Sequence, residues 1–187
     1  MTTPGDDPLA DLDDIALMAR IAESDEAALR VLIDRWKNPL INFFYRSLHS
    51  YETAEDLSQV VFVRVHRAAK KYQPTAKFST YIFHIARRLL INEYRHQQRK
   101  PLTPVDPEDL RNIKGPDSDR DVREIEEAFE QALEKIPENQ KTAILLLKQQ
   151  QLSYQEIATI MDASESAVKT WIFRARQFLK QELKDLV

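Results

Sequence analysis

A cluster of helix-breaking residues near the middle of the chain does most to limit what it can fold into. The cluster lies in an acidic stretch of low hydrophobicity and consists of Pro101, Pro104, Pro107, Gly115 and Pro116. Proline removes a backbone donor and fixes φ, and a segment of this composition buries too little apolar surface to pack. We therefore predict a flexible acidic linker over residues 101–121. It joins a first domain, residues 1–100, to a second domain, residues 122–187.

Both domains are predicted to be helical. The 187 residues include only two glycines, and 30% of them are charged, which favours helices over strands. Apolar side chains recur at helical spacing on both sides of the linker. In the first domain we expect residues 12–23, a helix capped by Ser24-Asp25 and interrupted by Pro39, a helix capped by Thr53, and a helix from Ser79 to about Gln98. In the second we expect residues 122–135, a helix opened by Pro137, and a helix pair over 152–186. The predicted fold class is all-α, with two small helical domains.

The helix pair at the end of the chain has strong start signals. Ser153 and Glu156 have the spacing of a capping box, and Ser164 is placed to cap the second helix. Asp162 falls between the helices, where the chain needs a turn or left-handed conformation. On the second helix, Phe173 interrupts an otherwise polar face, and an aromatic ring there suits the major groove of DNA better than water. We interpret the pair as a helix-turn-helix, with an ordinary amphipathic hairpin as the alternative.

Residues 64–100 form a basic segment that is interleaved with aromatic side chains. The segment carries ten basic residues and one acidic residue, although the whole chain has a net charge of −3. Its aromatic residues are Tyr72, Phe78, Tyr81, Phe83 and Tyr94. Because basic groups follow phosphates and aromatic faces stack on unpaired bases, this combination suits partly opened nucleic acid. Phe78 and Phe83 can equally belong to the core, whereas we expect Tyr72 to be accessible. The acidic segments that flank the basic one can mask it.

No pattern in the sequence supports catalysis, a metal site or a cofactor. The chain has no cysteine, no Gly-rich phosphate loop, and no histidine pair at metal-binding spacing. Its histidines are His49, His66, His84 and His96. Residues 1–14 lack the features of a secretory signal, and no apolar run is long enough to cross a membrane. We expect a cytoplasmic, non-enzymatic protein with no direct membrane insertion.

Three sequence runs occur together in a characteristic order. They are AEDLSQVVF at residues 54–62, FSTYIFHIAR at 78–87, and LSYQEIA with VKTWIFRAR at 152–158 and 168–176. The chain resembles bacterial RNA polymerase sigma factors of the extracytoplasmic-function (ECF) group, with domain two at about 20–100 and domain four at about 122–184. The resemblance implies a protein that directs core RNA polymerase to specific promoters and initiates transcription. The implied partners are the β′ clamp and β subunits of core polymerase, promoter DNA, and an anti-sigma factor.

The same resemblance implies roles for individual positions. Domain two would dock on the β′ clamp through Asp56, Leu57, Gln59, Val60 and Phe62. It would bind and open the −10 element through Lys70, Lys71, Tyr72, Lys77, Phe78, Ser79, Tyr81, His84, Arg87, Arg88, Asn92 and Arg95. Domain four would read the −35 element through Ser164, Ser166, Lys169, Thr170, Phe173, Arg174 and Arg176. The acidic linker resembles the segment that threads through the polymerase.

Several residues depart from the family pattern. They are Val60 in place of Glu, Tyr81 in place of Trp, Arg88 in place of Asn, Asn92 in place of Asp, Trp171 in place of a basic residue, and Asp162 and Ser166 in place of glycines. The changes put one clamp contact, the −10 preference and one phosphate contact in question. The alternative function is a stand-alone helix-turn-helix regulator, although an acidic linker is poorly suited to fix the spacing of two half-sites.

Overall fold

The protein is all-α, as predicted. The structure, a computed structural model, describes residues 9–99 and 120–184, and within these ranges it contains eight α-helices, one 3-10 segment and no strand. The predicted linker lies outside the described residues, apart from its last two. We refer to residues 9–99 as the N-terminal domain and to residues 120–184 as the C-terminal domain.

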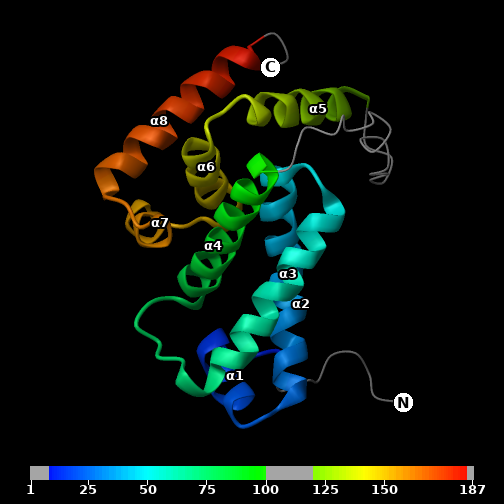
Figure 1. Cartoon of the computed structure of the whole chain (residues 1–187), viewed down its shortest axis with the longest axis vertical. Coiled ribbons are helices and arrows are strands. Elements are labelled where there is room, and N and C mark those ends of the chain that lie inside the picture. Colours follow the sequence, from blue (N-terminus) through cyan, green and yellow to red (C-terminus); the bar gives the residue numbers. More distant parts are fainter. Residues whose placement is uncertain (1–8, 100–119, 185–187) are drawn as a thin grey trace.

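The N-terminal domain is a bundle of long helices closed by a short one. Its elements are α1 (Asp14–Ala22), α2 (Glu26–Leu48), α3 (Tyr51–Ala68), the 3-10 segment η1 (Ala69–Lys71) and α4 (Phe78–Arg99). In Figure 1, α2, α3 and α4 run along the length of the molecule and α1 lies at its lower end. Helix α2 packs against each of the other three, so its buried side forms the middle of the domain.

The C-terminal domain covers the upper end of this bundle. Its elements are α5 (Arg120–Glu134), α6 (Glu138–Gln150), α7 (Tyr154–Met161) and α8 (Glu165–Glu182). Helix α8 packs against α5, α6 and α7, and α5 lies across the top in Figure 1. The boundaries agree with the sequence prediction to within a few residues, and five of the eight α-helices in the described ranges begin at a side-chain cap.

One predicted cap is wrong. Thr53 was expected to open α3, but the helix begins one turn earlier and Ser50 is its N-cap. The Ser50 hydroxyl accepts a hydrogen bond from the Thr53 amide at 3.3 Å and donates one to the Thr53 hydroxyl at 2.9 Å. Ser50 has extended backbone angles, which leave it outside the helix and free to satisfy an orphan amide.

Pro39 does not interrupt its helix, contrary to the prediction. Helix α2 is continuous from Glu26 to Leu48 with Pro39 inside it. Proline has no amide hydrogen, so the helix loses one backbone hydrogen bond at this point. The turn that follows buries Leu40, Ile41, Phe43 and Phe44, and this burial offsets the loss because packing outweighs local propensity.

An aromatic cluster holds α2 and α4 together. Phe43 and Phe83 are fully buried, and their ring centroids lie 5.4 Å apart in an edge-to-face arrangement. Trp36 contacts Phe83 and Phe78 in the same way, at 6.1 and 5.8 Å. Edge-to-face pairs add to the stabilisation that burial alone provides.

The Phe83→Ala variant tests this cluster. We expect it to lower the free energy of unfolding by about 3–5 kcal/mol, since a large ring is removed from a filled core. The measurement is a urea titration followed by the helical circular dichroism signal. Phe173→Ala is the control: this ring is 62% exposed, and its loss should change stability by less than about 0.5 kcal/mol. Equal effects of the two changes would contradict the assignment of Phe83 to the core.

The two domains pack against each other, which the sequence did not predict. Helix α4 contacts α7, and α2 contacts α5 and α6. The buried apolar side chains of both domains form one continuous cluster. The polar face of α8 stays outside this interface, and Lys169 and Arg174 are exposed.

Candidate nucleic-acid and protein interfaces

The helix-turn-helix has the predicted geometry. Ser153 caps α7 in a capping box: its hydroxyl accepts from the Glu156 amide at 3.2 Å, and its own amide donates to the Glu156 carboxylate at 2.8 Å. Ser164 caps α8 by accepting from the Ala167 amide at 3.2 Å. Asp162 ends α7 in the left-handed conformation, with φ 48°, which Asp tolerates better than most residues. These three start and stop signals fix the angle at which α8 leaves the turn.

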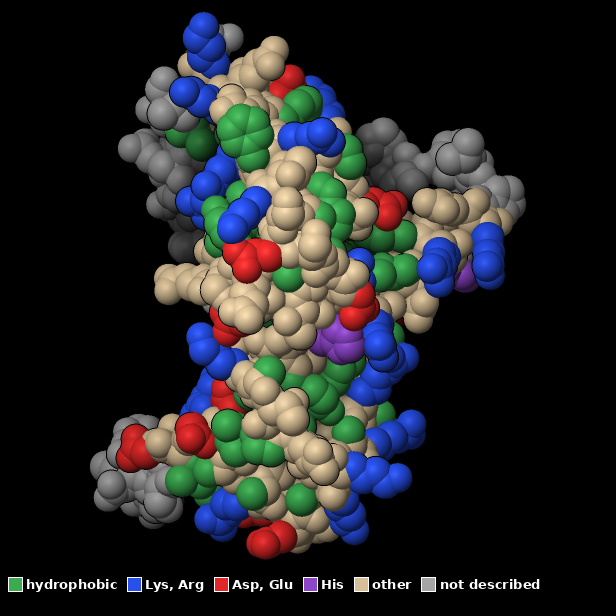
Figure 2. Space-filling view, turned by 90° about the vertical axis from the view of Figure 1, so that its left-hand side faces the viewer, with side chains coloured by type: hydrophobic (Ala, Val, Ile, Leu, Met, Phe, Trp, Pro, Cys, Tyr) green, Lys and Arg blue, Asp and Glu red, His purple; other side chains and the backbone are tan. Residues whose placement is uncertain are grey.

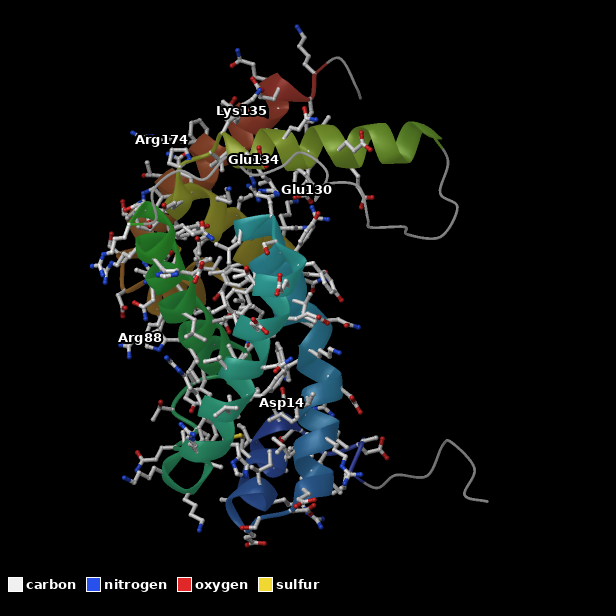
Figure 3. All side chains as sticks on the ribbon, turned by 45° about the vertical axis from the view of Figure 1, so that its right-hand side comes forward. Asp14, Arg88, Glu130, Glu134, Lys135 and Arg174 are labelled. Atoms are coloured by element: carbon white, nitrogen blue, oxygen red, sulfur yellow. The ribbon has the colours of Figure 1, made fainter. Side chains whose placement is uncertain are left out.

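Helix α8 separates apolar and polar side chains onto two faces. Its inner face buries Val168, Ile172, Ala175 and Leu179, with Trp171 half-buried beside them. Every residue that was predicted to read the −35 element is exposed, and the outer face carries Ser166, Lys169, Thr170, Phe173 and Arg174. Ser164 caps the helix, and Arg176 lies at its flank, where it lines a groove with Phe129 and Leu179. Figure 3 shows Arg174 pointing away from the body of the protein.

Phe173 is the most informative residue of this outer face. It is the most exposed large apolar side chain in the described part of the chain. Nearby, Thr170 donates to the Ser166 carbonyl at 3.0 Å and Lys169 pairs with Glu165 at 2.7 Å, so both of these side chains have a partner on their own helix. An exposed aromatic ring on an otherwise polar face is typical of a binding surface.

The basic helix α4 has a cationic outer side. Lys70, Lys71 and Lys77 are exposed in the loop before it, and Arg88, Asn92 and Arg95 are exposed along it. Ser79, His84 and Arg87 are partly buried. Figure 2 shows Lys and Arg side chains on both the upper and lower parts of the face that it presents. In Figure 3, Arg88 on α4 and Arg174 on α8 point to the same side of the molecule.

The aromatic residues near the start of α4 correct part of the sequence interpretation. Phe78 is only 3% exposed and Phe83 is fully buried, so both belong to the core and neither offers a face for base stacking in this conformation. Tyr72 was expected to be accessible, but it is half-buried and its hydroxyl oxygen is covered. Its ring packs against Tyr81 at 4.9 Å and against Phe78 at 6.2 Å. Burial raises the pKa of both tyrosines.

Helix α3 presents a mixed apolar and polar face. Asp56 and Gln59 are exposed, Val60 is 39% exposed and Val63 is 48% exposed. These residues lie one or two helical turns apart on one side. Phe62, also predicted to dock on polymerase, is only 8% exposed and packs inward. The sequence analysis did not include Val63 among the residues of this exposed face. The available signal was the number of valines in α3, because Val61 and Val65 fill its buried face and leave Val60 and Val63 exposed.

A charged cluster joins α2 to α5 at the domain boundary. Arg46 pairs with Glu130 at 2.6 Å, and its guanidinium lies 5.3 Å from the centre of the Phe129 ring. His49 lies 3.7 Å from Glu130 and 3.8 Å from Glu134; Figure 3 shows both glutamates on the side of α5 that faces the bundle. Burial raises the pKa of Glu130 and lowers the pKa of His49. No sequence pattern indicated this cluster, because its members on α2 and α5 are far apart along the chain.

A groove of about 410 Å³ opens beside this cluster. Its floor is apolar, with Phe129, Ile144, Leu145 and Leu179, and three cationic side chains line it as well: Arg46, Lys148 and Arg176. The junction of the two domains is therefore not filled to the density of a protein interior.

The boundary between α4 and α7 is also ionic. Lys77 pairs with Glu156 at 2.9 Å, and Asp162 lies 3.7 Å from His84 and 4.0 Å from Arg87. Burial lowers the pKa of Arg87, and the nearby carboxylate of Asp162 offsets only part of this shift. Three residues assigned from the sequence to the −10 element, Lys77, His84 and Arg87, thus contact the helix-turn-helix at its first cap and its turn.

Two features are not found in the parts of the chain that the structure describes. Among the described residues, no group of three or more His, Cys, Asp and Glu side chains could hold a metal ion. No helix among residues 9–99 and 120–184 is long and apolar enough to cross a membrane.

Comparison with protein families agrees with this geometry. Residues 32–100 match the model of sigma-70 region 2, and residues 126–179 match the model of sigma-70 region 4. The first match contains α3 and α4, and the second contains the helix-turn-helix. The chain belongs to the sigma-70 family of bacterial RNA polymerase sigma factors, within the ECF group.

Curated relatives are similar over nearly their whole length. The chain is 27% identical to the RNA polymerase sigma-H factor of Pseudomonas aeruginosa, with 93% of this chain and 95% of the relative covered. It is 28% identical to the ECF RNA polymerase sigma-E factor of Haemophilus influenzae, with 94% and 98% covered. The protein acts in promoter-directed initiation of transcription.

Solved structures share the fold. CnrH, solved in complex with the cytosolic domain of CnrY, has a TM-score of 0.70 and 21% identity, covering 92% of this chain and 97% of that one. The sigma factor RpoE, solved in complex with the anti-sigma factor NepR from Bartonella quintana, has a TM-score of 0.66 and 20% identity, covering 83% and 96%.

Proposed function

We propose that the two domains divide promoter recognition between them. Domain two, residues 1–100, binds and opens the −10 element with the cationic side of α4 and the loop before it. Domain four, residues 122–187, reads the −35 element with the outer face of α8. The observation that carries this proposal is the exposed ring of Phe173 between Lys169 and Arg174 on a helix fixed by two caps. In the major groove, the ring contacts a thymine methyl and the cations reach phosphates or guanine.

The exposed face of α3 is proposed to dock on the β′ clamp of core polymerase. Val60 and Val63 supply apolar area there, and Asp56 and Gln59 supply polar contacts at its edge. This mixture suits an interface that forms between two folded proteins. The face belongs to a helix other than α4 and α8, so polymerase and promoter have separate surfaces available.

Further parts of the proposal follow from the family. The protein has no catalytic activity of its own, works in the cytoplasm, and is held by an anti-sigma factor when it is not needed. Two similar chains were solved in complex with such a factor or a cytosolic partner domain. A stand-alone helix-turn-helix regulator would use the outer face of α8 and would leave the valine face of α3 without a role.

The direct test is transcription with purified components. Core RNA polymerase and this protein are incubated with genomic DNA, and the transcript 5′ ends are sequenced. We expect starts at a limited set of sites that share two dissimilar upstream boxes about two helical turns apart. Core polymerase alone is the control. A palindromic footprint by the protein alone, without new transcripts, would support the stand-alone regulator instead.

The Val63→Asp variant tests the docking face of α3. Burying an unpaired carboxylate against polymerase should weaken binding to core polymerase about tenfold or more, which corresponds to at least ~1.4 kcal/mol. Binding is measured by fluorescence anisotropy of the labelled protein. Ile15→Asp is the matched control, because Ile15 is also a β-branched residue, 41% exposed, but on α1. The assignment fails if both variants bind like the unaltered protein.

The Arg174→Ala variant tests readout by α8. If Arg174 contacts a guanine with two hydrogen bonds, its loss should cost about 1–3 kcal/mol on the correct −35 box and relax the preference at that base. Competition binding of polymerase with this protein to matched and altered promoters measures both effects. Lys180→Ala removes an exposed charge further along α8 and should weaken binding slightly on all sequences. An equal loss on every sequence for Arg174→Ala would make it a phosphate contact.

A further inference from the structure

The groove beside the Arg46–Glu130 pair combines an apolar floor with a cationic edge, and the proposed function makes no use of it. The residues that line it come from four helices, α2, α5, α6 and α8. Three of these helices, α5, α6 and α8, lie together at the upper end of the molecule in Figure 1. The volume of about 410 Å³ falls within the range of small-molecule sites, roughly 300–1,000 Å³. The groove is therefore of a size to hold a small ligand.

Helices α6 and α8 each place one apolar and one cationic side chain along the groove. Leu145 and Lys148 are three residues apart on α6, and Arg176 and Leu179 are three residues apart on α8. Side chains at this spacing share one face of a helix, and the two helices pack against each other. Leu145 and Leu179 belong to the core, whereas Lys148 and Arg176 are exposed. The groove thus has apolar side chains at its bottom and positive charges at its edge.

Two of the three cations of the groove are available to a ligand. Arg46 is already engaged, because it pairs with Glu130 at 2.6 Å and lies 5.3 Å from the centre of the Phe129 ring. Among the described side chains, Lys148 and Arg176 pair with no carboxylate, and no acidic residue lines the groove. An anion at this edge would therefore meet two positive charges with no internal competitor, and hydrogen bonds between ions are the strong ones.

We propose that the groove binds a small amphipathic anion as a free molecule, namely a carboxylate with an unbranched alkyl tail. The tail covers Phe129, Leu145 and Leu179, and the carboxylate lies at the edge with Lys148 and Arg176. Burial of the tail drives binding, and the two cations select an anionic head over a neutral or cationic one. A membrane surface fits less well, because the apolar side chains lie at the bottom of a groove, where a flat bilayer does not reach them.

Titration calorimetry on the full-length chain tests the proposal, with decanoate below its micelle concentration as the probe. We expect saturable binding of one decanoate per chain. Butanoate keeps the carboxylate and loses most of the tail, so it should bind at least tenfold more weakly, since each buried methylene contributes about 0.8 kcal/mol. Decyltrimethylammonium keeps the tail and reverses the charge of the head, so it should also bind more weakly. Absence of decanoate binding would overturn the proposal, as would equal binding of either of the other two compounds.

A charge-reversal pair of variants locates the carboxylate. Lys148→Glu should weaken decanoate binding about fivefold, because it replaces an attractive exposed charge with a repulsive one. Lys180→Glu is the matched control: Lys180 is an exposed lysine of α8 that does not line the groove, and the change in net charge is the same. An equal loss in the two variants would show a general charge effect and would overturn the proposal.

A second pair of variants locates the tail. Phe129→Ala should weaken decanoate binding about tenfold, because it removes apolar area from the groove. Phe178→Ala is the matched control, since Phe178 is a half-buried ring that packs on the core outside the groove. Circular dichroism checks that both variants remain helical. If Phe129→Ala does not fold, the Lys148→Glu and Lys180→Glu pair decides. A folded Phe129→Ala variant that binds decanoate like the unaltered chain would overturn the proposal.

Two other occupants give different results. If monomeric decanoate does not bind and the chain instead forms a dimer that Lys148→Glu dissociates in sedimentation velocity, the groove is a contact between two copies. If decanoate does not bind and the chain sediments with phosphatidylglycerol vesicles unless Lys148 is changed to Glu, the occupant is a bilayer. Both results overturn the proposal. These measurements use neither DNA nor polymerase, so they are independent of the transcription assay that tests the proposed function.

Discussion

The burial of α2 is the constraint on which the rest of the structure depends. This helix packs against α1, α3 and α4 in its own domain and against α5 and α6 in the other. Its aromatic residues Trp36 and Phe43 contact α4, and its C-terminal end carries Arg46 and His49 to the domain boundary. The continuity of α2 through Pro39 matters here, because a break would separate the aromatic cluster from the charged one. The cost of one missing hydrogen bond is small beside the apolar area that the unbroken helix buries.

The parts of the fold that local chemistry controls could be predicted from the sequence. Ser153, Glu156, Asp162 and Ser164 act through contacts within three residues or through their own backbone angles, so the helix-turn-helix follows from spacing alone. The amphipathic pattern of α8 likewise placed Phe173 on the outer face. The predicted cap of α3 was wrong by three residues. Ser50 and Thr53 both have a hydroxyl that can cap a helix, and only packing in the bundle determines which of them does so.

The parts that tertiary packing controls could not be predicted. Phe78 and Tyr72 lie in a basic, aromatic segment that also fits a stacking surface, and only the position of α2 turns Phe78 inward. The contact of Arg46 with Glu130, or of Lys77 with Glu156, joins residues of different domains across the linker. No periodicity or capping signal extends over such a separation, so the packing of the two domains against each other had to come from the structure.

The turn residue Asp162 combines two properties that the chain could have kept apart. Its left-handed backbone ends α7, and its carboxylate faces His84 and Arg87. The family commonly has glycine around this turn, and glycine provides the same backbone angle with no charge. A single codon change at this site would therefore alter the affinity between the domains while leaving the shape of the DNA reader intact.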